Sequence, residues 1–216
     1  IVLKGKGNKK LLTQRNAFLV HEISNVIFQS TDIFIISTFC STSLASVYAI
    51  YQLIYNSLNS LIGVLNKSTE FVLGQSYNRG IEDYIRKHDL YETFYITLVF
   101  SVMTSACVLT IPFIKLYTKG VSDINYIYPY LPYLFTLIQL LSCSRAVCTK
   151  LINIAGHAKN TQLNTIIEST INLVASIAFV KFLGIYGVLL GTILALLYRS
   201  NDIIIYANTK ILRRKP

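Results

Sequence analysis

Residues 91–114 read YETFYITLVFSVMTSACVLTIPFI, an apolar run whose polar groups are mostly small hydroxyls. In a lipid bilayer every backbone N–H and C=O group must be paired within the segment, so an apolar run of this length is a helix. A membrane-spanning strand would need strict alternation over about ten residues, and this run is too long and too continuous for that. At about 1.5 Å per residue it can cross a hydrocarbon core of about 30 Å.

Five further stretches share this length and apolar character. The chain has 216 residues, of which 53% are hydrophobic and 14% are charged, whereas soluble domains are roughly 25% charged. The fold class that we predict is all-α, a multi-pass transmembrane bundle of about six helices. The expected spans are 16–38, 44–66, 91–114, 130–152, 163–183 and 187–208. They make one bundle, residues 16–208, between a cytoplasmic basic segment, 1–15, and a cytoplasmic tail, 209–216.

The basic residues predict the orientation of the spans. Fifteen Lys and Arg fall in the N-terminal segment, the second loop, the fourth loop and the tail, while only Lys115, Lys119 and Lys181 fall on the other side. Basic loops stay in the cytoplasm, so we expect both termini there and an even number of spans. Topology then accounts for the net charge of +10. No basic helix or aromatic RNA-binding motif accompanies that charge, so we expect no nucleic-acid partner.

The N-terminus and the cysteines carry weaker signals. The chain begins at Ile1 with a basic stretch that lacks the apolar core and cleavage site of a signal peptide, and we expect a segment of a longer protein.

The four cysteines form neither a CxxC pair nor a Cys/His metal spacing. We expect them to be buried small hydrophobes and we expect no metal site. They are Cys40, Cys107, Cys143 and Cys148.

Polar residues inside the predicted spans form three stripes. Each polar group at this depth is costly unless it faces protein or water. Their spacing of three or four residues places them on one helix face. Single amides often only hold helices together, at about 0.6–2 kcal/mol each, but two neighbouring stripes around a carboxylate favour a water-filled cavity. The stripes are Glu22, Asn25, Gln29 and Asp32; Gln52, Asn56 and Asn59, continued by Asn66 and Glu70; and Asn164, Glu168 and Asn172.

Two arginines also lie within predicted spans. Arg145 is the group that we most expect to bind an anion, because an isolated cation at this depth needs a partner. A phosphate could be that partner, and so could Asp32 or Glu168. Arg199 and Asp202 are three residues apart, and we expect them to form a structural ion pair.

A small-residue face enters the last predicted span. Its members recur at helical intervals and share one side of the helix. Small residues let two helix backbones approach closely, so close packing is the role that we expect. The face comprises Gly184, Gly187, Gly191 and Ala195.

Several segments resemble a known family. Residues 29–37, QSTDIFIIS, followed by 44–51, LASVYAIY, resemble the seventh-to-eighth-span region of bacterial polysaccharide flippases of the O-antigen type, in the multidrug/oligosaccharidyl-lipid/polysaccharide exporter superfamily. Residues 156–160, GHAKN, the stretch 160–172 and residues 184–192, GIYGVLLGT, are similar to the short cytoplasmic loop and the last two core spans of that family. The resemblance covers nearly the whole chain and the C-terminal half of a family member.

The resemblance implies half of a two-bundle transporter whose central cavity opens alternately to each side. It implies movement of an undecaprenyl-diphosphate-linked oligosaccharide across the bacterial cytoplasmic (inner) membrane for O-antigen or capsule biosynthesis, without enzymatic catalysis. Partners would be that lipid-linked oligosaccharide, membrane lipids, the N-terminal half of the transporter, and polysaccharide polymerase and chain-length proteins. We expect no cofactor, with energy from substrate flux or from coupling to Na⁺ or H⁺. The expected cavity residues are Asn25, Gln29, Asp32, Gln52, Asn56, Asn59, Arg145, Glu168 and Asn172.

Other functions remain open. An ion-coupled multidrug or metabolite antiporter of the same fold needs a carboxylate that binds Na⁺ or H⁺, and Asp32 or Glu168 could serve. A membrane-embedded polysaccharide polymerase or transferase usually needs a sizeable external loop or a His/Asp pair, whereas the external loops here are short. The histidines, His21, His88 and His157, all fall at or near predicted cytoplasmic ends. A non-transporting remnant or scaffold is a further option.

Overall fold

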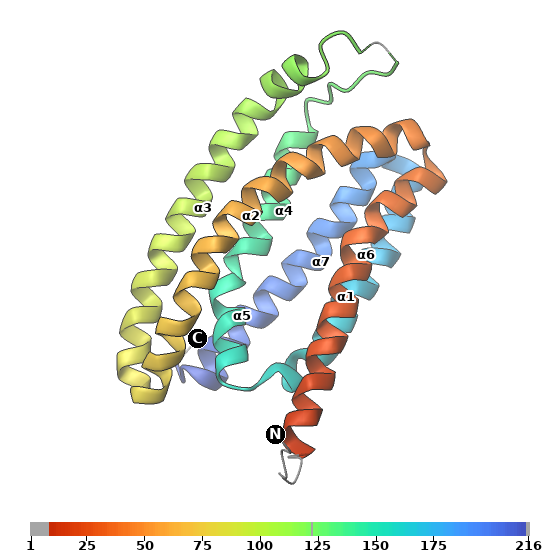
Figure 1. Cartoon of the computed structure of the whole chain (residues 1–216). Coiled ribbons are helices and arrows are strands. Elements are labelled where there is room, and N and C mark those ends of the chain that lie inside the picture. The colour runs from red at the N-terminus through yellow and green to blue at the C-terminus, as the bar shows by residue number, and fades with distance from the viewer. Residues whose placement is uncertain (1–8, 122, 215–216) are drawn as a thin grey trace, which may run out of the picture.

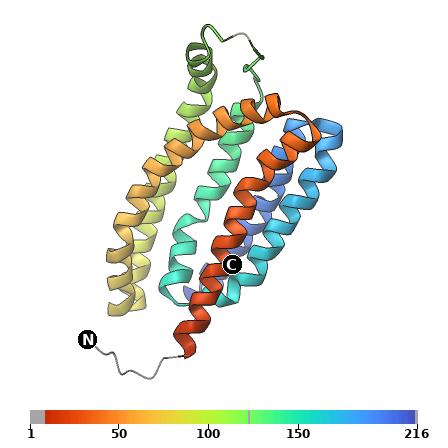
Figure 2. The same cartoon turned by 45° about the vertical axis from the view of Figure 1, so that its right-hand side comes forward.

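The computed structural model describes residues 9–121 and 123–214, which form helices and connecting turns without a strand. In chain order the elements are α1 (Lys9–Phe39), α2 (Thr42–Arg79), α3 (Ile81–Tyr117), α4 (Leu131–Ser144), α5 (Ala146–Ile154), a 3₁₀ turn η1 (Ala158–Thr161), α6 (Gln162–Leu183), α7 (Ile185–Tyr206) and a π-helical turn η2 (Ala207–Ile211). They run along one long axis in an elongated bundle, and α1 begins at the end of the bundle where η2 finishes (Figures 1 and 2). Of the predicted basic segment and tail, residues 1–8 and 215–216 lie outside the described residues.

Within the described residues, four helical stretches have the length and the apolar composition to cross a membrane. They coincide with four of the six predicted spans, and an all-helical bundle is thereby confirmed. Helices α1 and α2 cover the remaining two predicted spans and are long enough, with 31 and 38 residues. They do not reach the same apolar composition, because the polar stripes lie on them. The four stretches are Ile81–Tyr117, Leu131–Ile154, Ala158–Leu183 and Ile185–Ile211.

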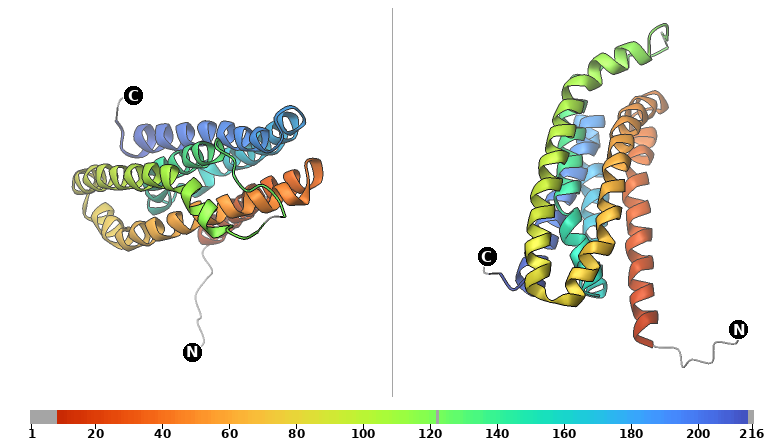
Figure 3. Two further views of the ribbon diagram at one scale, coloured as in Figure 1. Left: turned by 90° about the horizontal axis from the view of Figure 1, so that it is seen from above. Right: turned by 60° about the vertical axis from the view of Figure 1, so that its left-hand side comes forward.

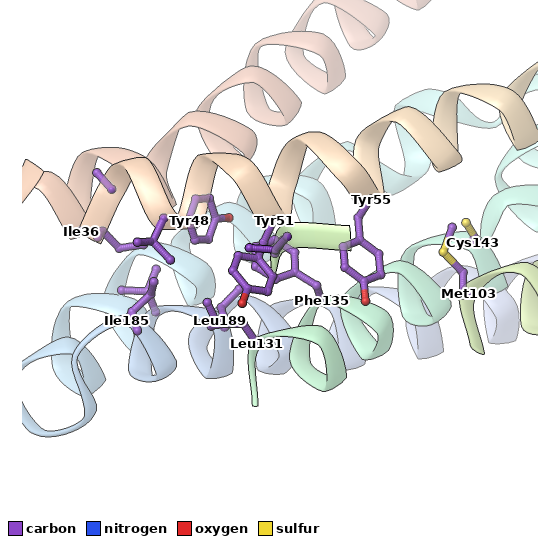
Figure 4. Close-up of a cluster of buried hydrophobic side chains, with 14 of the residues drawn as sticks. Ile36, Tyr48, Tyr51, Tyr55, Met103, Leu131, Phe135, Cys143, Ile185 and Leu189 are labelled. Atoms are coloured by element: carbon purple, nitrogen blue, oxygen red, sulfur yellow. The ribbon is translucent and has the colours of Figure 1, made fainter. Parts of the chain in front are cut away.

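The main hydrophobic core is organised by aromatic rings between α2 and α4. Tyr48, Tyr51 and Tyr55 are spaced three and four residues apart, so they share one face of α2. Their ring centroids lie 5.2, 6.0 and 5.5 Å from that of Phe135 on α4 (Figure 4). Buried tyrosine hydroxyls need a partner, and the Tyr55 hydroxyl donates to the Pro132 carbonyl at 2.9 Å. This row fixes the position of α4 behind α2.

Helices α6 and α7 pack closely through glycine. A Cβ atom on Gly187 would clash with the carbonyl oxygen of Phe179, and one on Gly191 would lie 2.6 Å from the backbone nitrogen of Ser176. The predicted close packing is confirmed at these two positions. It is wrong for Gly184, where nothing lies within 4 Å of a Cβ. That glycine joins α6 to α7 with a φ of +56°, a left-handed conformation that glycine adopts readily.

The predicted span 130–152 is interrupted at Arg145, which separates α4 from α5. An interruption frees backbone carbonyl groups, and these are tolerated at membrane depth only where neighbouring groups bond to them. The Leu141 carbonyl accepts hydrogen bonds from the hydroxyls of Ser144 and of Ser200 on α7, each at 2.8 Å. Helix α7 therefore supports the interruption through Ser200.

The close contact between α6 and α7 gives a stability prediction. Gly187→Ala is expected to force the two backbones apart and to destabilise the chain by about 1–3 kcal/mol. Gly63→Ala on α2 is the matched control, because a Cβ atom added there would have nothing within 4 Å, and alanine is the better helix former. Thermal unfolding in detergent micelles measures both. Equal melting temperatures for the two variants would contradict the packing role of Gly187.

Candidate functional site

A polar cavity opens between α1 and α2 and extends to α4 and α7. Its volume is about 110 Å³. The predicted stripes supply most of its polar lining, because residues three or four apart lie on one helix face. We call this cavity the amide cleft. The predicted residues that line it are Asn25, Gln29, Asp32, Gln52, Asn56, Asn59 and Arg145.

Asp32 in the amide cleft is 3% exposed and is held by three other helices. Its Oδ2 accepts hydrogen bonds from the Tyr48 hydroxyl of α2 at 3.0 Å and the Thr192 hydroxyl of α7 at 2.8 Å. The Asn172 amide of α6 donates to Oδ1 at 3.5 Å and to the Thr192 hydroxyl oxygen at 2.9 Å. Burying a carboxylate is costly unless it is paired or hydrogen-bonded, and these donors meet that requirement.

Asn172 was predicted to line the cavity, and it lies instead behind Asp32. It is fully buried and does not belong to the lining of the amide cleft. Its own Oδ1 has no hydrogen-bond partner within residues 9–121 and 123–214. An unpaired buried carbonyl oxygen costs about 1–3 kcal/mol, so this atom is available to a further donor or to a cation.

A second polar cavity of about 220 Å³ adjoins the amide cleft and shares Asn25, Phe28 and Arg145 with it. Residues of α1, α5, α6 and α7 line it. We call it the ionic cavity, because Glu168 and Arg199 also face it. The two cavities together form one polar strip along the inner side of α1. Eight of the nine predicted site residues line that strip, and Asn172 supports it from behind.

Arg145 has an acidic partner in the ionic cavity. Its Nη1 lies 2.7 Å from Oε1 of Glu168. The sequence left Asp32, Glu168 and a bound anion open as partners, and the structure pairs the guanidinium with Glu168. The side chain of Arg145 remains 19% exposed and lines both cavities. Anion binding there stays a prediction.

Arg199 shares the same carboxylate. Its Nε lies 3.5 Å from Oε2 of Glu168, and its Nη1 lies 2.5 Å from Oδ2 of Asp202. The predicted pair between Arg199 and Asp202 is therefore confirmed. Glu168 bridges two arginines and is 7% exposed, which makes it the centre of a buried ionic network. Such a network is strongly destabilised when one member is removed.

The polar strip is open along α1 and α2. Asn25, Gln29 and Asn56 are exposed, while Gln52 and Asn59 are half-buried. Seen along the bundle, α1 and α2 lie on one side and α7 lies on the other (Figure 3). The exposed amides therefore lie where the strip opens, on the side of the bundle that α1 and α2 form. Further along α2, the backbone carbonyl of Asn66 accepts a bond from Lys150 and its side chain accepts one from Tyr91, so the second stripe leaves the cleft there.

The sequence reasoning missed two groups that hold the cleft together. Tyr48 lies four residues before Gln52, and that spacing could have added it to the second stripe. Thr192 follows Gly191 on the close-packed face of α7. The residues three and four positions away from it are apolar, so it did not belong to a polar stripe. The remaining polar residues in the lining of the amide cleft, besides these and the predicted ones, are Gln139 and Ser142.

Two of the three histidines bond across helices. His21 Nε2 lies 3.0 Å from the Ala158 carbonyl oxygen, and its Nδ1 lies 2.8 Å from the Thr165 hydroxyl. His157 Nδ1 lies 3.0 Å from the Tyr206 hydroxyl. These contacts join α1 to α6 and the turn before η1 to α7. They give His21 and His157 a packing role at the end of the bundle where α1 begins.

Comparisons of the chain with protein-family models, with curated proteins and with solved structures found no match. The features that bear on function are those of the polar strip. The amide cleft is rich in neutral amides around the buried carboxylate of Asp32. The ionic cavity holds the carboxylate of Glu168 between two arginines.

The ionic network gives a second stability prediction. Glu168→Gln keeps the side-chain size but leaves Arg145 and Arg199 without their shared charge, so a loss of about 3 kcal/mol is expected. Asp83→Asn removes the partner of Lys87 in a pair whose side chains are 41% and 37% exposed, and it should change stability by less than about 1 kcal/mol. Thermal or denaturant unfolding in micelles distinguishes the two. A Glu168→Gln variant as stable as Asp83→Asn would contradict the network.

Proposed function

We propose that this chain forms one half of a transporter that moves an undecaprenyl-diphosphate-linked oligosaccharide across the bacterial cytoplasmic membrane. The observation that carries the proposal is the amide cleft, in which six Asn and Gln side chains and Arg145 face one cavity. Amide side chains both donate and accept hydrogen bonds, as sugar hydroxyls require. An arginine beside them supplies the bidentate donor that suits a phosphate.

In this proposal Arg145 serves the diphosphate and the amides serve the sugars. The guanidinium already pairs with Glu168 at 2.7 Å, so a bound diphosphate would share or replace that partner. Because Glu168 also lies 3.5 Å from Arg199, its charge stays compensated when Arg145 turns to a substrate. The network therefore lets one cation bind and release an anion without stranding a buried charge.

The exposed amides also support the proposal that a partner half packs against this chain and that the chain has six spans. Asn25, Gln29 and Asn56 are exposed on the face of α1 and α2, and polar groups at membrane depth are stable only against protein or water. An N-terminal half docked on that face would enclose them in a central cavity. Helices α1 and α2 would then cross the membrane between lipid and the partner half, with both termini in the cytoplasm as the basic loops predict.

Complementation tests the transport proposal. The full reading frame that contains this segment is placed in strains that lack their own O-antigen flippase and differ in glycan, and surface polysaccharide is scored on gels. Arg145→Ala and Asn56→Ala are expected to reduce restored polysaccharide at least about tenfold, equivalent to about 1.4 kcal/mol in a binding step. Membrane levels of each variant are measured alongside.

Ser60→Ala is the matched control for Asn56→Ala. Ser60 lies one helical turn further along α2, is exposed, and bonds only to its own helix at the Asn56 carbonyl. It should restore polysaccharide like the unmodified chain. Restoration unaffected by Arg145→Ala and Asn56→Ala would remove the amide cleft from the transport path. Drug resistance gained without restored polysaccharide would favour the antiporter.

The antiporter, or an ion-coupled flippase, is favoured by one specific observation at Asp32. The buried carboxylate of Asp32 accepts hydrogen bonds from the Thr192 hydroxyl and the Asn172 amide, and the Oδ1 of Asn172 has no hydrogen-bond partner among the described residues. Oxygen ligands of this kind suit a hard cation. Na⁺ held there by these three side chains would link α1, α6 and α7, so that its release loosens their contact. A proton that binds to and leaves Asp32 would likewise change the contact between these helices.

Ion coupling predicts a Na⁺-specific effect on stability. A ligand that binds only the folded state raises the melting temperature, so purified chain should melt higher in NaCl than in KCl at equal ionic strength. Asp32→Asn should abolish that difference. Asp123→Asn, in the exposed loop before α4, should keep it. A pH-dependent shift lost only in Asp32→Asn would indicate H⁺ instead, and no ion effect at all would leave substrate flux as the driving force.

A further inference from the structure

A separate cluster of chemically active side chains lies at the end of the bundle where α2 turns into α3. The first turns of α3, helix α5 and the C-terminal segment meet at this end (Figure 1). They enclose a second hydrophobic core that includes Tyr84, Cys148, Leu151, Ala207 and Leu212. The polar groups beside this core are not used by the proposed transport function.

Three potential metal ligands converge there. His88 and Glu92 are one helical turn apart on α3, a spacing that presents two ligands on one helix face. Cys148 comes from α5, and one ligand atom of each residue lies within 4.8 Å of the others. Glu92 Oε1 lies 3.6 Å from Cys148 Sγ, and Glu92 Oε2 lies 3.8 Å from His88 Nδ1. None of the three lines the amide cleft or the ionic cavity.

These separations suit a tetrahedral zinc ion. With Zn–S near 2.3 Å and Zn–N or Zn–O near 2.0 Å, neighbouring ligand atoms in a tetrahedron lie about 3.3–3.5 Å apart. The distances from the two Glu92 oxygens to Cys148 and to His88 exceed that by a few tenths of an ångström, and the three groups lie within 4.8 Å of one another. A thiolate, an imidazole and a carboxylate together favour Zn²⁺ over Mg²⁺ or Ca²⁺. Three protein ligands leave the fourth position to water.

Burial also favours a ligand role for His88. The imidazole is 1% exposed, and its Nε2 has no hydrogen-bond partner in the described part of the chain. Its Nδ1 is 3.4 Å from Asp89 and 3.8 Å from Glu92, so hydrogen bonding alone accounts poorly for an imidazole buried here. Cys148 is also fully buried, while Glu92 is 26% exposed and leaves a path for an ion to enter.

We propose that His88, Glu92 and Cys148 bind one Zn²⁺ ion that joins α3 to α5. Binding replaces the thiol proton of Cys148 with the metal and releases that proton to solvent. Asp89 next to His88 pairs both its carboxylate oxygens with Arg214 Nη2 at 2.6 Å. This ion pair ties the C-terminal segment to the part of α3 that carries His88.

Cobalt substitution and metal analysis test this site. The full chain is purified in detergent micelles, depleted of metal, and titrated with Co²⁺, which gives a thiolate-to-cobalt charge-transfer band when cysteine ligates it. We expect that band at one equivalent of Co²⁺, loss of the band on adding Zn²⁺, and one Zn²⁺ per chain by elemental analysis after dialysis.

Variants assign the ligands. Cys148→Ser should abolish the band, and Glu92→Gln should weaken Co²⁺ binding at least about tenfold while the band remains visible at high Co²⁺. Cys143→Ser is the matched control, since Cys143 is also buried and lies outside the cluster, and it should keep the band. Circular dichroism confirms that each variant is folded. A folded unmodified chain that shows no band, or a band that survives Cys148→Ser, would overturn the proposal.

Discussion

The carboxylate of Asp32 is the constraint on which the arrangement of the helices depends. A negative charge that is 3% exposed in a bundle of apolar helices must be matched by donors, and they come from Tyr48, Thr192 and Asn172 on three different helices. Thr192 can approach because Gly191, beside it in the chain, lets α7 lie against α6. Tyr48 begins the aromatic row that places α4. The buried carboxylate of Asp32 thus joins the polar strip to the aromatic row between α2 and α4 and to the close contact between α6 and α7.

The polar strip divides the work between neutral and charged groups. Amides around a single carboxylate line the amide cleft, and Glu168 lies between two arginines in the ionic cavity. Neutral groups tolerate repeated exchange of hydrogen-bond partners, whereas a charge at this depth must keep a counter-charge throughout. Arg145 borders both parts and can change partner because Arg199 remains with Glu168. In the proposed transport function, this arrangement would serve a cargo with a sugar portion and an anionic portion.

Much of the fold could be predicted, because the length of apolar runs sets the helices and the three-to-four spacing of Asn25, Gln29 and Asp32 sets one polar face. The choice between Asp32 and Glu168 as partner of Arg145 could not be predicted, because it depends on the tilt and rotation of helices that are far apart in sequence. Gly184 looked like part of a packing face because spacing does not reveal a backbone angle. The approach of Cys148 to His88 joins segments sixty residues apart, which no local pattern records.

The interruption at Arg145 places a mechanical joint and a charge at the same residue. A continuous helix resists bending through its unbroken ladder of backbone hydrogen bonds, and a broken one bends where the ladder stops. Any change of angle between α4 and α5 would swing the guanidinium across the boundary between the two cavities. A change in the bend of this span and a change in the position of its cation would therefore be a single event.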